Sequence, residues 1–208
     1  MSQRTVGILT FDDVEVLDFT GPFEVFSVAR LSEERRREEP SPFDVWLVAE
    51  SDQPVTTSGG MKVLPLYTTA NCPHLDILVI PGGWGTRRLL THEPLLEWIR
   101  KQSDSVSLLT SVCTGALLLG QAGLLDGRRA TTHWKSLDVM EELLPNVTVV
   151  RDQHVVEEGD VLTSAGISAG IEMALRVVAR ECGESVARAT AAHMEYPFPE
   201  DNRRRVKA

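Results

Sequence analysis

The chain alternates between short apolar runs, which suit buried strands, and longer stretches in which apolar residues recur at helical spacing. The main predicted strands are residues 6–10, 43–50, 75–80 and 106–112. Shorter strands are predicted near residues 61–64, 147–150, 155–156 and 161–162. Strands that alternate with helices favour a largely parallel sheet with helices on both faces. The pattern therefore predicts an α/β fold.

Helical spacing follows several of these strands. The predicted helices cover residues 87–101, 115–122, 136–144, 165–179 and 183–192. A further helix is expected to start at Gly21-Pro22, because proline is favoured at the first helical position. Glu24 then falls in the first turn, where a carboxylate interacts favourably with the helix dipole. This start leaves Asp18 in the loop after the first strand.

Composition supports a single globular domain over residues 1–208, with a core from about residue 5 to residue 196. Hydrophobic residues make up 42% and charged residues 25% of the 208 positions, which is ordinary for such a domain. No apolar run approaches the roughly 20 residues that span a bilayer, and the first residues do not resemble a signal peptide. We therefore expect a cytoplasmic protein that does not bind membranes.

Charge and cysteine usage narrow the function classes. A formal net charge of −9 argues against nucleic-acid binding, which needs a basic surface. The basic tail at residues 203–207 is expected to be frayed and solvated. Three cysteines without a C-x-x-C pair indicate free thiols, and Cys72 and Cys182 look structural. No His, Cys and carboxylate cluster has metal-ligand spacing, so no metal or cofactor is expected.

Cys113 stands apart, in the segment Ser111-Val-Cys-Thr-Gly115 between a predicted strand and a predicted helix. A side chain on such a turn sits at the helix N-terminus, where the dipole and free amides stabilise a thiolate. We therefore expect a nucleophilic cysteine with a lowered pKa, as on a nucleophile elbow. The alternative is a buried structural thiol.

Two further segments are predicted to lie beside this cysteine. Pro81-Gly82-Gly83 ends the neighbouring parallel strand, at the sheet edge where ligands bind. Its amides could face a reacting atom, as in an oxyanion hole, although a plain strand–helix turn would look the same. Asp18 lies between Leu17 and Phe19, so desolvation would raise its pKa and suit it to proton transfer. A capping aspartate is the alternative.

Several segments together resemble the ThiJ/PfpI superfamily. They are Asp18-Phe-Thr-Gly-Pro-Phe-Glu24, Ile80-Pro-Gly-Gly83, Thr110-Ser-Val-Cys-Thr-Gly115, Ala122-Gly-Leu-Leu-Asp-Gly127, Arg129-Ala-Thr-Thr-His-Trp134 and residues 163–170. Within the superfamily the pattern is most similar to the isonitrile hydratases. The similarity runs from about residue 5 to residue 196. It implies a flavodoxin-like sandwich of the class I glutamine amidotransferase type.

The resemblance also implies roles for individual residues. Cys113 matches the family nucleophile, and Asp18 matches the acidic residue that hydrogen-bonds to it. Thr114 matches the threonine next to the nucleophile in the hydratases. The backbone amides of Gly83, with Gly82, and of Thr114 match donors that position the reacting atom.

Two residues of the same motifs, Glu24 and His133, are expected to support the site from behind these groups. Family members form homodimers with the active site near the interface, so a homodimer is expected here. The three apolar rings of Phe19, Phe23 and Phe26 around Asp18 add weak support.

The activity implied is cofactor-free hydration of small organic isocyanides to N-substituted formamides. One alternative is a glyoxalase-like or amidase-like enzyme on the same site. Thr114 stands where protease-like members carry histidine, which counts against Cys–His hydrolysis. Another alternative is a redox or small-molecule sensor, since similar motifs occur in sensor domains of AraC-type regulators. Only 12 residues follow Tyr196, too few for a DNA-binding module in this chain.

Overall fold

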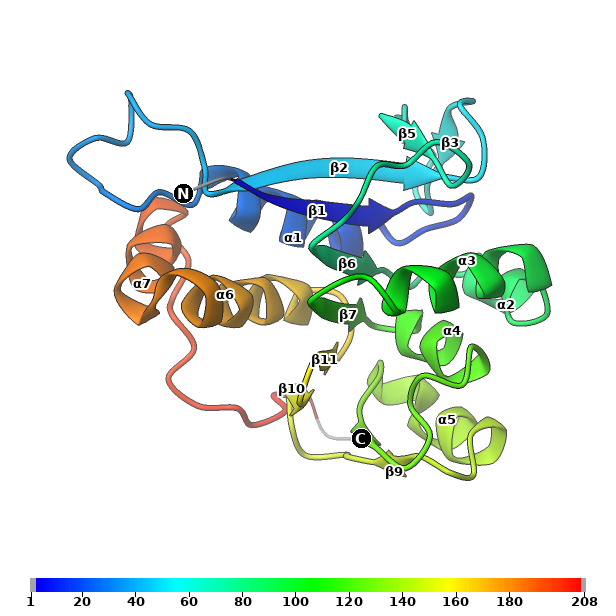
Figure 1. Cartoon of the computed structure of the whole chain (residues 1–208). Coiled ribbons are helices and arrows are strands. Elements are labelled where there is room, and N and C mark those ends of the chain that lie inside the picture. The colour runs from blue at the N-terminus through cyan, green and yellow to red at the C-terminus, as the bar shows by residue number, and fades with distance from the viewer. Residues whose placement is uncertain (1–2, 207–208) are drawn as a thin grey trace.

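A seven-stranded sheet forms the centre of the computed structural model, which describes residues 3–206. Its strands, in spatial order, are β10 (Val155–Glu158), β11 (Val161–Ser164), β7 (Leu108–Val112), β6 (Ile77–Ile80), β1 (Arg4–Leu9), β2 (Phe43–Ala49) and β5 (Tyr67–Thr68). Every neighbouring pair is parallel except β10 with β11 (Figure 1). The predicted, mostly parallel sheet is confirmed.

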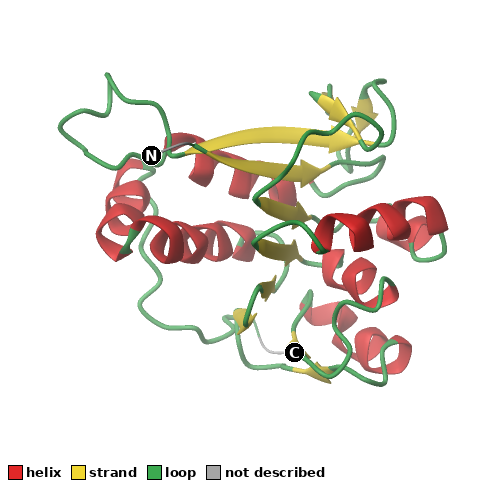
Figure 2. Ribbon diagram, viewed as in Figure 1, coloured by secondary structure: helices red, strands yellow, loops and turns green. Residues whose placement is uncertain are grey.

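Helices cover both faces of this sheet, as Figure 2 shows. Helices α1 (Val16–Val28), α6 (Ala169–Cys182) and α7 (Glu184–His193) pack together on one face. On the other face lie α2 (Thr86–Leu89), α3 (Glu93–Ser103) and α4 (Gly115–Gln121). The fold also contains the 3₁₀ turn η1 (Trp134–Ser136) and helix α5 (Leu137–Leu143). Two small strand pairs lie outside the main sheet: β3 (Val55–Thr56) with β4 (Lys62–Val63), and β8 (Arg129–Ala130) with β9 (Thr148–Val149). The flavodoxin-like sandwich expected from the sequence is confirmed.

The sheet centre explains why the strands read as unbroken apolar runs. All four residues of β6 and all five of β7 are buried, because helices exclude water from both faces. Each large apolar side chain removed from water stabilises the fold by about 1.5–3 kcal/mol. This packing fixes the carboxyl ends of β6 and β7, which lead directly into Gly82 and Cys113.

Helix α1 starts five residues before the predicted Gly21-Pro22. It begins at Val16, so Asp18 lies in its first turn and Pro22 is inside the helix. The proline removes one helical hydrogen bond, but Phe19, Val25 and Phe26 are buried by the longer helix. Tertiary packing therefore outweighs the local preference, and the expectation of Asp18 in a loop is wrong.

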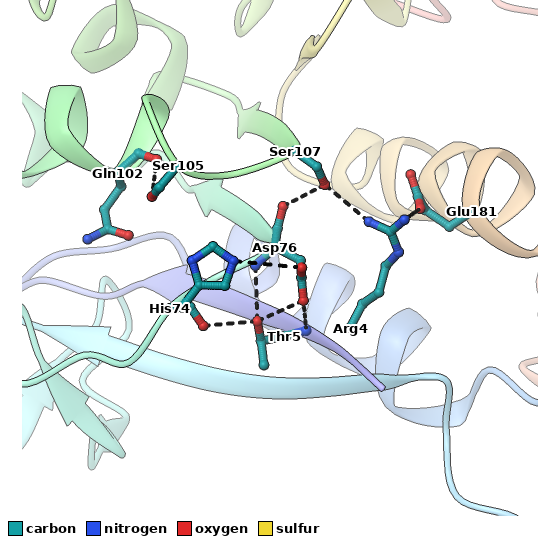
Figure 3. Close-up of polar contacts among 8 residues, drawn as sticks. All are labelled: Arg4, Thr5, His74, Asp76, Gln102, Ser105, Ser107 and Glu181. Carbon is teal, nitrogen blue, oxygen red and sulfur yellow. Dashed lines mark hydrogen bonds and ion pairs between the residues drawn. The ribbon is translucent and has the colours of Figure 1, made fainter. Parts of the chain in front are cut away.

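A polar network joins the amino ends of the central strands β1, β6 and β7 (Figure 3). The amide and hydroxyl of Thr5 donate to Asp76 Oδ2 at 2.8 and 3.0 Å. Ser107 Oγ donates to the Asp76 carbonyl at 2.9 Å, and Arg4 links Ser107 to Glu181 of α6. The network ties three strands and a helix together and has a structural role.

The described part of the basic tail, residues 203–206, is not frayed, contrary to expectation, while Lys207 lies outside the described residues. Arg203 forms a β-bridge with Gln153, and the Arg204 amide donates to Asp152 O at 2.7 Å. The Arg204 guanidinium is half-buried and donates to the carbonyl of Arg151 at 2.7 Å. These backbone partners order the tail, because carbonyl groups replace the water that a solvated guanidinium would bind. No helix among residues 3–206 has the length and apolar character needed to cross a membrane.

Candidate active site

A short turn joins β7 to α4 (Figure 1). Cys113 occupies this turn in a left-handed conformation. Its φ of 57° is uncommon for a residue with a side chain. Its N–H donates to the carbonyls of Ser164 and Ala165 at 3.2 and 3.1 Å, which hold the turn. Gly115 lets the turn approach β6, since a Cβ there would lie 2.0 Å from Ile80 O. The predicted strand-to-helix turn is confirmed, and surrounding contacts maintain its strained backbone.

Asp18 enters the same region from helix α1 and is completely buried. Its Oδ2 accepts a hydrogen bond from the Gly82 amide at 3.0 Å. Burial raises the pKa of Asp18 from 3.8 to about 7, against the opposing effects of hydrogen bonds from Gly82 and the Cys113 thiol. Oδ1 has no hydrogen-bond donor in good geometry among the described residues. The carboxyl therefore gains and loses its proton near neutral pH, beside a thiol.

The Cys113 thiol does not have the lowered pKa expected from its place at a helix start. Burial raises its pKa strongly, and the Asp18 charge raises it further. Hydrogen bonds from the Thr114 amide and hydroxyl oppose the shift without reversing it. The expectation is wrong because one short helix supplies less stabilisation than burial and a neighbouring carboxylate remove. The resting pair is a thiol next to a titrating carboxyl.

The amides of the glycine turn bind site side chains. The Gly83 N–H donates to Thr114 Oγ1 at 3.0 Å, while that of Gly82 donates to Asp18. Thr86, which is buried, donates to the Gly83 carbonyl at 2.7 Å and lies 3.1 Å from Thr114 Oγ1. Instead of facing a reacting atom as expected, the two glycine amides position Asp18 and Thr114. The Thr114 amide faces the thiol.

Gly82 is required by the close approach of these groups. A Cβ at this position would lie 2.5 Å from the Thr114 amide nitrogen and 2.9 Å from Asp18 Oδ2. Such contacts are too short for any side chain, so even alanine would push the carboxyl or the nucleophile turn away. The glycine thus sets the spacing between Asp18 and the Cys113–Thr114 peptide.

A cavity of about 240 Å³ opens above the thiol. It is lined by Glu15, Gly83, Trp84, Arg87, Cys113, Thr114, His133, Lys135, Ser136 and Ile167. This volume is below the roughly 300–1,000 Å³ of pockets for drug-sized ligands, so it suits a small molecule. Neither Cys72 nor Cys182 contributes to its wall, and burial raises the pKa of both thiols.

His133 lines this cavity, whereas Glu24 does not take part. The His133 Nδ1 accepts from the Lys135 amide at 3.3 Å, and its ring packs against Gly166. Burial and the nearby Lys135 lower the pKa of His133, which favours the neutral ring. The Glu24 side chain is exposed on α1, and no hydrogen bond or ion pair within residues 3–206 links it to the site. The structure thus gives the expected supporting role of Glu24 no contact among the described residues.

Several site residues were not predicted from the sequence. Ile167 lines the cavity with a φ of 60°, and its amide faces the Asp18 carboxyl. The Thr132 hydroxyl donates to the Cys113 carbonyl at 2.7 Å. A β-branched residue after Ala-Gly gives no local sign of such a conformation, although both Ile167 and Thr132 lie in segments already singled out. Among the described residues, no cluster of three or more His, Cys, Asp or Glu could hold a metal ion.

Fold and site together define a flavodoxin-like α/β protein with a cysteine-centred cavity at the carboxyl edge of its sheet. The sequence profile of the DJ-1/PfpI family matches residues 4–180. The chain belongs to this family, and the resemblance to the ThiJ/PfpI superfamily is confirmed.

Individual relatives differ in function. The isonitrile hydratase of Pseudomonas putida is 40% identical over 195 residues, which make up 93% of this chain and 79% of that protein. The HTH-type transcriptional regulator CdhR of Pseudomonas aeruginosa is 34% identical over 68% of this chain, but the match spans only 42% of the regulator. A crystal structure of a ThiJ/PfpI family protein from Pseudomonas syringae superposes with a TM-score of 0.82 and 29% identity, covering 97% of this chain and 79% of that one.

Proposed function

We propose that this protein hydrates small organic isocyanides to N-substituted formamides through Cys113, without a cofactor. The observation that carries the proposal is the pairing of Cys113, on its left-handed turn, with a buried Asp18 whose pKa is about 7. An acid–base group works best when its pKa is near the working pH. Similarity to an isonitrile hydratase over 93% of the chain supports the same chemistry.

In the first step the Asp18 carboxylate accepts the thiol proton while Cys113 Sγ attacks the terminal isocyanide carbon. Asp18 then delivers that proton to the same carbon, which gives a thioimidate, Cys–S–CH=N–R. The raised thiol pKa makes this transfer necessary, since little free thiolate is present beforehand. The Thr114 amide, which faces Sγ, holds the sulfur in line.

In the second step water adds to the thioimidate carbon. Asp18, again a carboxylate, accepts a proton from the water and passes it to the substrate nitrogen. The carbon–sulfur bond then breaks, the hydroxyl proton returns to sulfur, and the N-substituted formamide leaves. One substrate and one water give one product, and the thiol and carboxyl end as they began.

The alternative of a small-molecule or redox sensor has one observation in its favour, the similarity to the regulator CdhR. A glyoxalase-like or amidase-like reaction is less well supported, because Thr114 leaves the thiol without an adjacent histidine base. The cavity histidine, His133, has a lowered pKa, and its Nδ1 is engaged by the backbone.

A turnover assay with phenyl isocyanide tests the proposal. Wild-type protein should form N-phenylformamide with no added metal or nucleotide, and Cys113→Ala should form none. Cys182→Ala is the matched control, because that thiol lies outside the cavity. No formamide from wild-type protein, together with ready oxidation of Cys113 by peroxide, would favour the sensor alternative.

We further propose that the protein is a homodimer. Large apolar side chains are exposed around the cavity. The exposed fraction is 65% for Trp84, 38% for Ile167 and 38% for Trp134. Leu17, next to Asp18 on α1, is also exposed. Exposed apolar groups gathered in one region are typical of a contact surface.

A further inference from the structure

Two cations line the active-site cavity from separate elements. Arg87 comes from α2, after the glycine turn, and Lys135 comes from η1. Each lies over a tryptophan ring: the Arg87 guanidinium carbon is 4.1 Å from the Trp84 ring centroid, and Lys135 Nζ is 5.1 Å from that of Trp134. Stacking on an aromatic face restricts a long side chain without using its hydrogen-bond donors.

These donors have no acidic partner within residues 3–206. Neither Arg87 nor Lys135 forms an ion pair, although the chain has a net charge of −9 and most of its arginines are paired. The adjacent Arg88 shows the contrast, because it binds Asp13 Oδ2 at 2.7 Å. In an acidic protein, two unpaired cations in the wall of one small cavity leave room for an anion from outside.

The other titratable groups of the cavity do not neutralise this pair. Glu15 is the one carboxylate among the lining residues, and its Oε2 accepts a hydrogen bond from Ser58, which lies outside the cavity wall. Asp18 is buried behind the wall and bonded to Gly82. His133 favours its neutral form because burial lowers its pKa. The lining therefore presents two positive groups and one negative group.

We propose that the substrate of this site carries an anionic group, specifically a carboxylate, on the organic substituent of the isocyanide. This rests on the proposed function and specifies its substrate class. The terminal carbon would lie at Cys113, a short apolar body would lie along Ile167 and Trp84, and the carboxylate would bind Arg87 and Lys135. Arginine and lysine bind carboxylates through charge-assisted hydrogen bonds, and a small cavity limits the distance between the two ends.

The test compares 4-isocyanobenzoate with its methyl ester, two substrates that differ in charge at the remote end. Because they also differ in intrinsic reactivity, the ratio of their kcat/KM values is compared between proteins. We expect the ratio (acid over ester) to fall by about 5-fold in Arg87→Gln and in Lys135→Gln, and by more in the double variant, mainly through the KM of the acid. Raising the salt to 0.5 M should weaken the wild-type preference.

Arg88→Gln is the matched control. It removes a neighbouring arginine on the same helix, one that is bonded to Asp13 and does not line the cavity. It should leave the acid-to-ester ratio unchanged. An equal fall in Arg88→Gln would mean that general surface charge, and no specific contact, sets the preference, which would overturn the inference.

Other outcomes separate this inference from the proposed function. If both substrates turn over and the ratio is the same in wild type, Arg87→Gln and Lys135→Gln, the inference is wrong and the hydratase proposal stands. If those variants change the mass measured by light scattering and leave the ratio unchanged, the cations belong to a contact between copies, and the inference is again wrong.

If neither substrate turns over, the hydratase proposal fails, and binding of the unreactive 4-cyanobenzoate decides the question. Calorimetry showing binding to wild-type protein that is lost in the Arg87→Gln, Lys135→Gln double variant would support a carboxylate site. Binding that is absent, or unchanged by the substitutions, would overturn it.

Discussion

The Thr132 hydroxyl donates a 2.7 Å hydrogen bond to the carbonyl of Cys113, so the nucleophile turn is held from a segment that follows it by 19 residues. Both groups are buried. Thr132→Val leaves that carbonyl without its partner, at a cost of about 1–3 kcal/mol in unfolding free energy, and should lower kcat by about 10-fold as the thiol loses its alignment. Denaturant melts and formamide assays measure the two effects.

Thr110→Val is the control for this prediction. Thr110 is equally buried in β7, and its hydroxyl donates to Leu78 O at 3.1 Å. Its loss should cost similar stability and leave kcat near the wild-type value. Equal losses of kcat in both variants would show that Thr132 acts only through stability.

Asp18→Asn should make the protein more stable at neutral and alkaline pH. The folded pKa is raised from 3.8 to about 7, so the folded state holds a proton that the unfolded state releases, and stability falls as the pH rises between these values. Above pH 7 the buried carboxylate lowers the free energy of unfolding by its full amount, about 4 kcal/mol. Asparagine removes it, so the difference from wild type should grow from pH 4 to pH 7 in denaturant melts.

Asp76→Asn should change the stability of the protein in the opposite direction from Asp18→Asn. Burial opposes the shift, but hydrogen bonds from Thr5, together with the charges of Arg4 and His74, lower the Asp76 pKa. The carboxylate therefore contributes stability above its unfolded pKa, and this contribution is lost as the pH falls through the folded pKa. The variant should be less stable than wild type at pH 7, with the difference shrinking towards acid. Parallel profiles for the two aspartate variants would contradict the assignment of both shifts.

Asp18→Asn should also separate thiol reactivity from turnover. The carboxylate raises the thiol pKa, so its removal should speed alkylation of Cys113 by iodoacetamide at pH 8, read by mass spectrometry. Turnover should fall by about 100-fold or more, because an amide transfers no proton. Asp18→Glu should retain part of the activity. Slower alkylation in Asp18→Asn would show that the carboxylate activates the resting thiol.

Thr114→Val should impair catalysis and preserve the fold. The change keeps the branched shape but removes the hydroxyl that accepts from the Gly83 amide at 3.0 Å and donates to the Gly83 carbonyl at 3.3 Å. We expect kcat to fall by about 10- to 100-fold, with circular dichroism unchanged. Thr86→Val probes the next contact, 3.1 Å away, and should have a smaller effect. A larger loss of kcat in Thr86→Val than in Thr114→Val would show that Thr86 contributes more to catalysis than Thr114.

Light scattering should return twice the 23.0 kDa mass of one chain. Trp84→Glu places a charge among the exposed apolar groups near the cavity and should lower the measured mass by raising the dissociation constant. Leu64→Glu, at another exposed apolar position, is the control. A mass of about 23 kDa for wild type at all usable concentrations would refute the dimer.

Local patterns in the sequence were enough to place most of the fold. The apolar runs of β1, β6 and β7 are buried on both faces, so their composition alone indicates strands. The start of α1 was missed because burial of Phe19 and Phe26, which depends on the whole fold, outweighs the preference of Pro22.

The site was predicted only where a motif carried it. Cys113, Asp18 and Thr114 come together as expected, because β7 ends at the Cys113–Thr114 turn and the first turn of α1 brings Asp18 to the Gly82 amide. The bond from Gly83 to Thr114 spans 31 residues and that from Arg204 to Thr132 spans 72, so no local pattern reports them. The thiol pKa was mispredicted for the same reason: the burial shared by two distant groups decides it.

The ordered residues of the basic tail are connected to the nucleophile turn. The Arg204 guanidinium donates to the Thr132 carbonyl at 3.1 Å, and the Thr132 hydroxyl binds the carbonyl of Cys113. Two contacts therefore separate the last described residues from the nucleophile. A change at Arg204 would therefore act on the nucleophile turn through this connection, whereas β1, which begins at Arg4, starts at the ends of the strands away from Cys113.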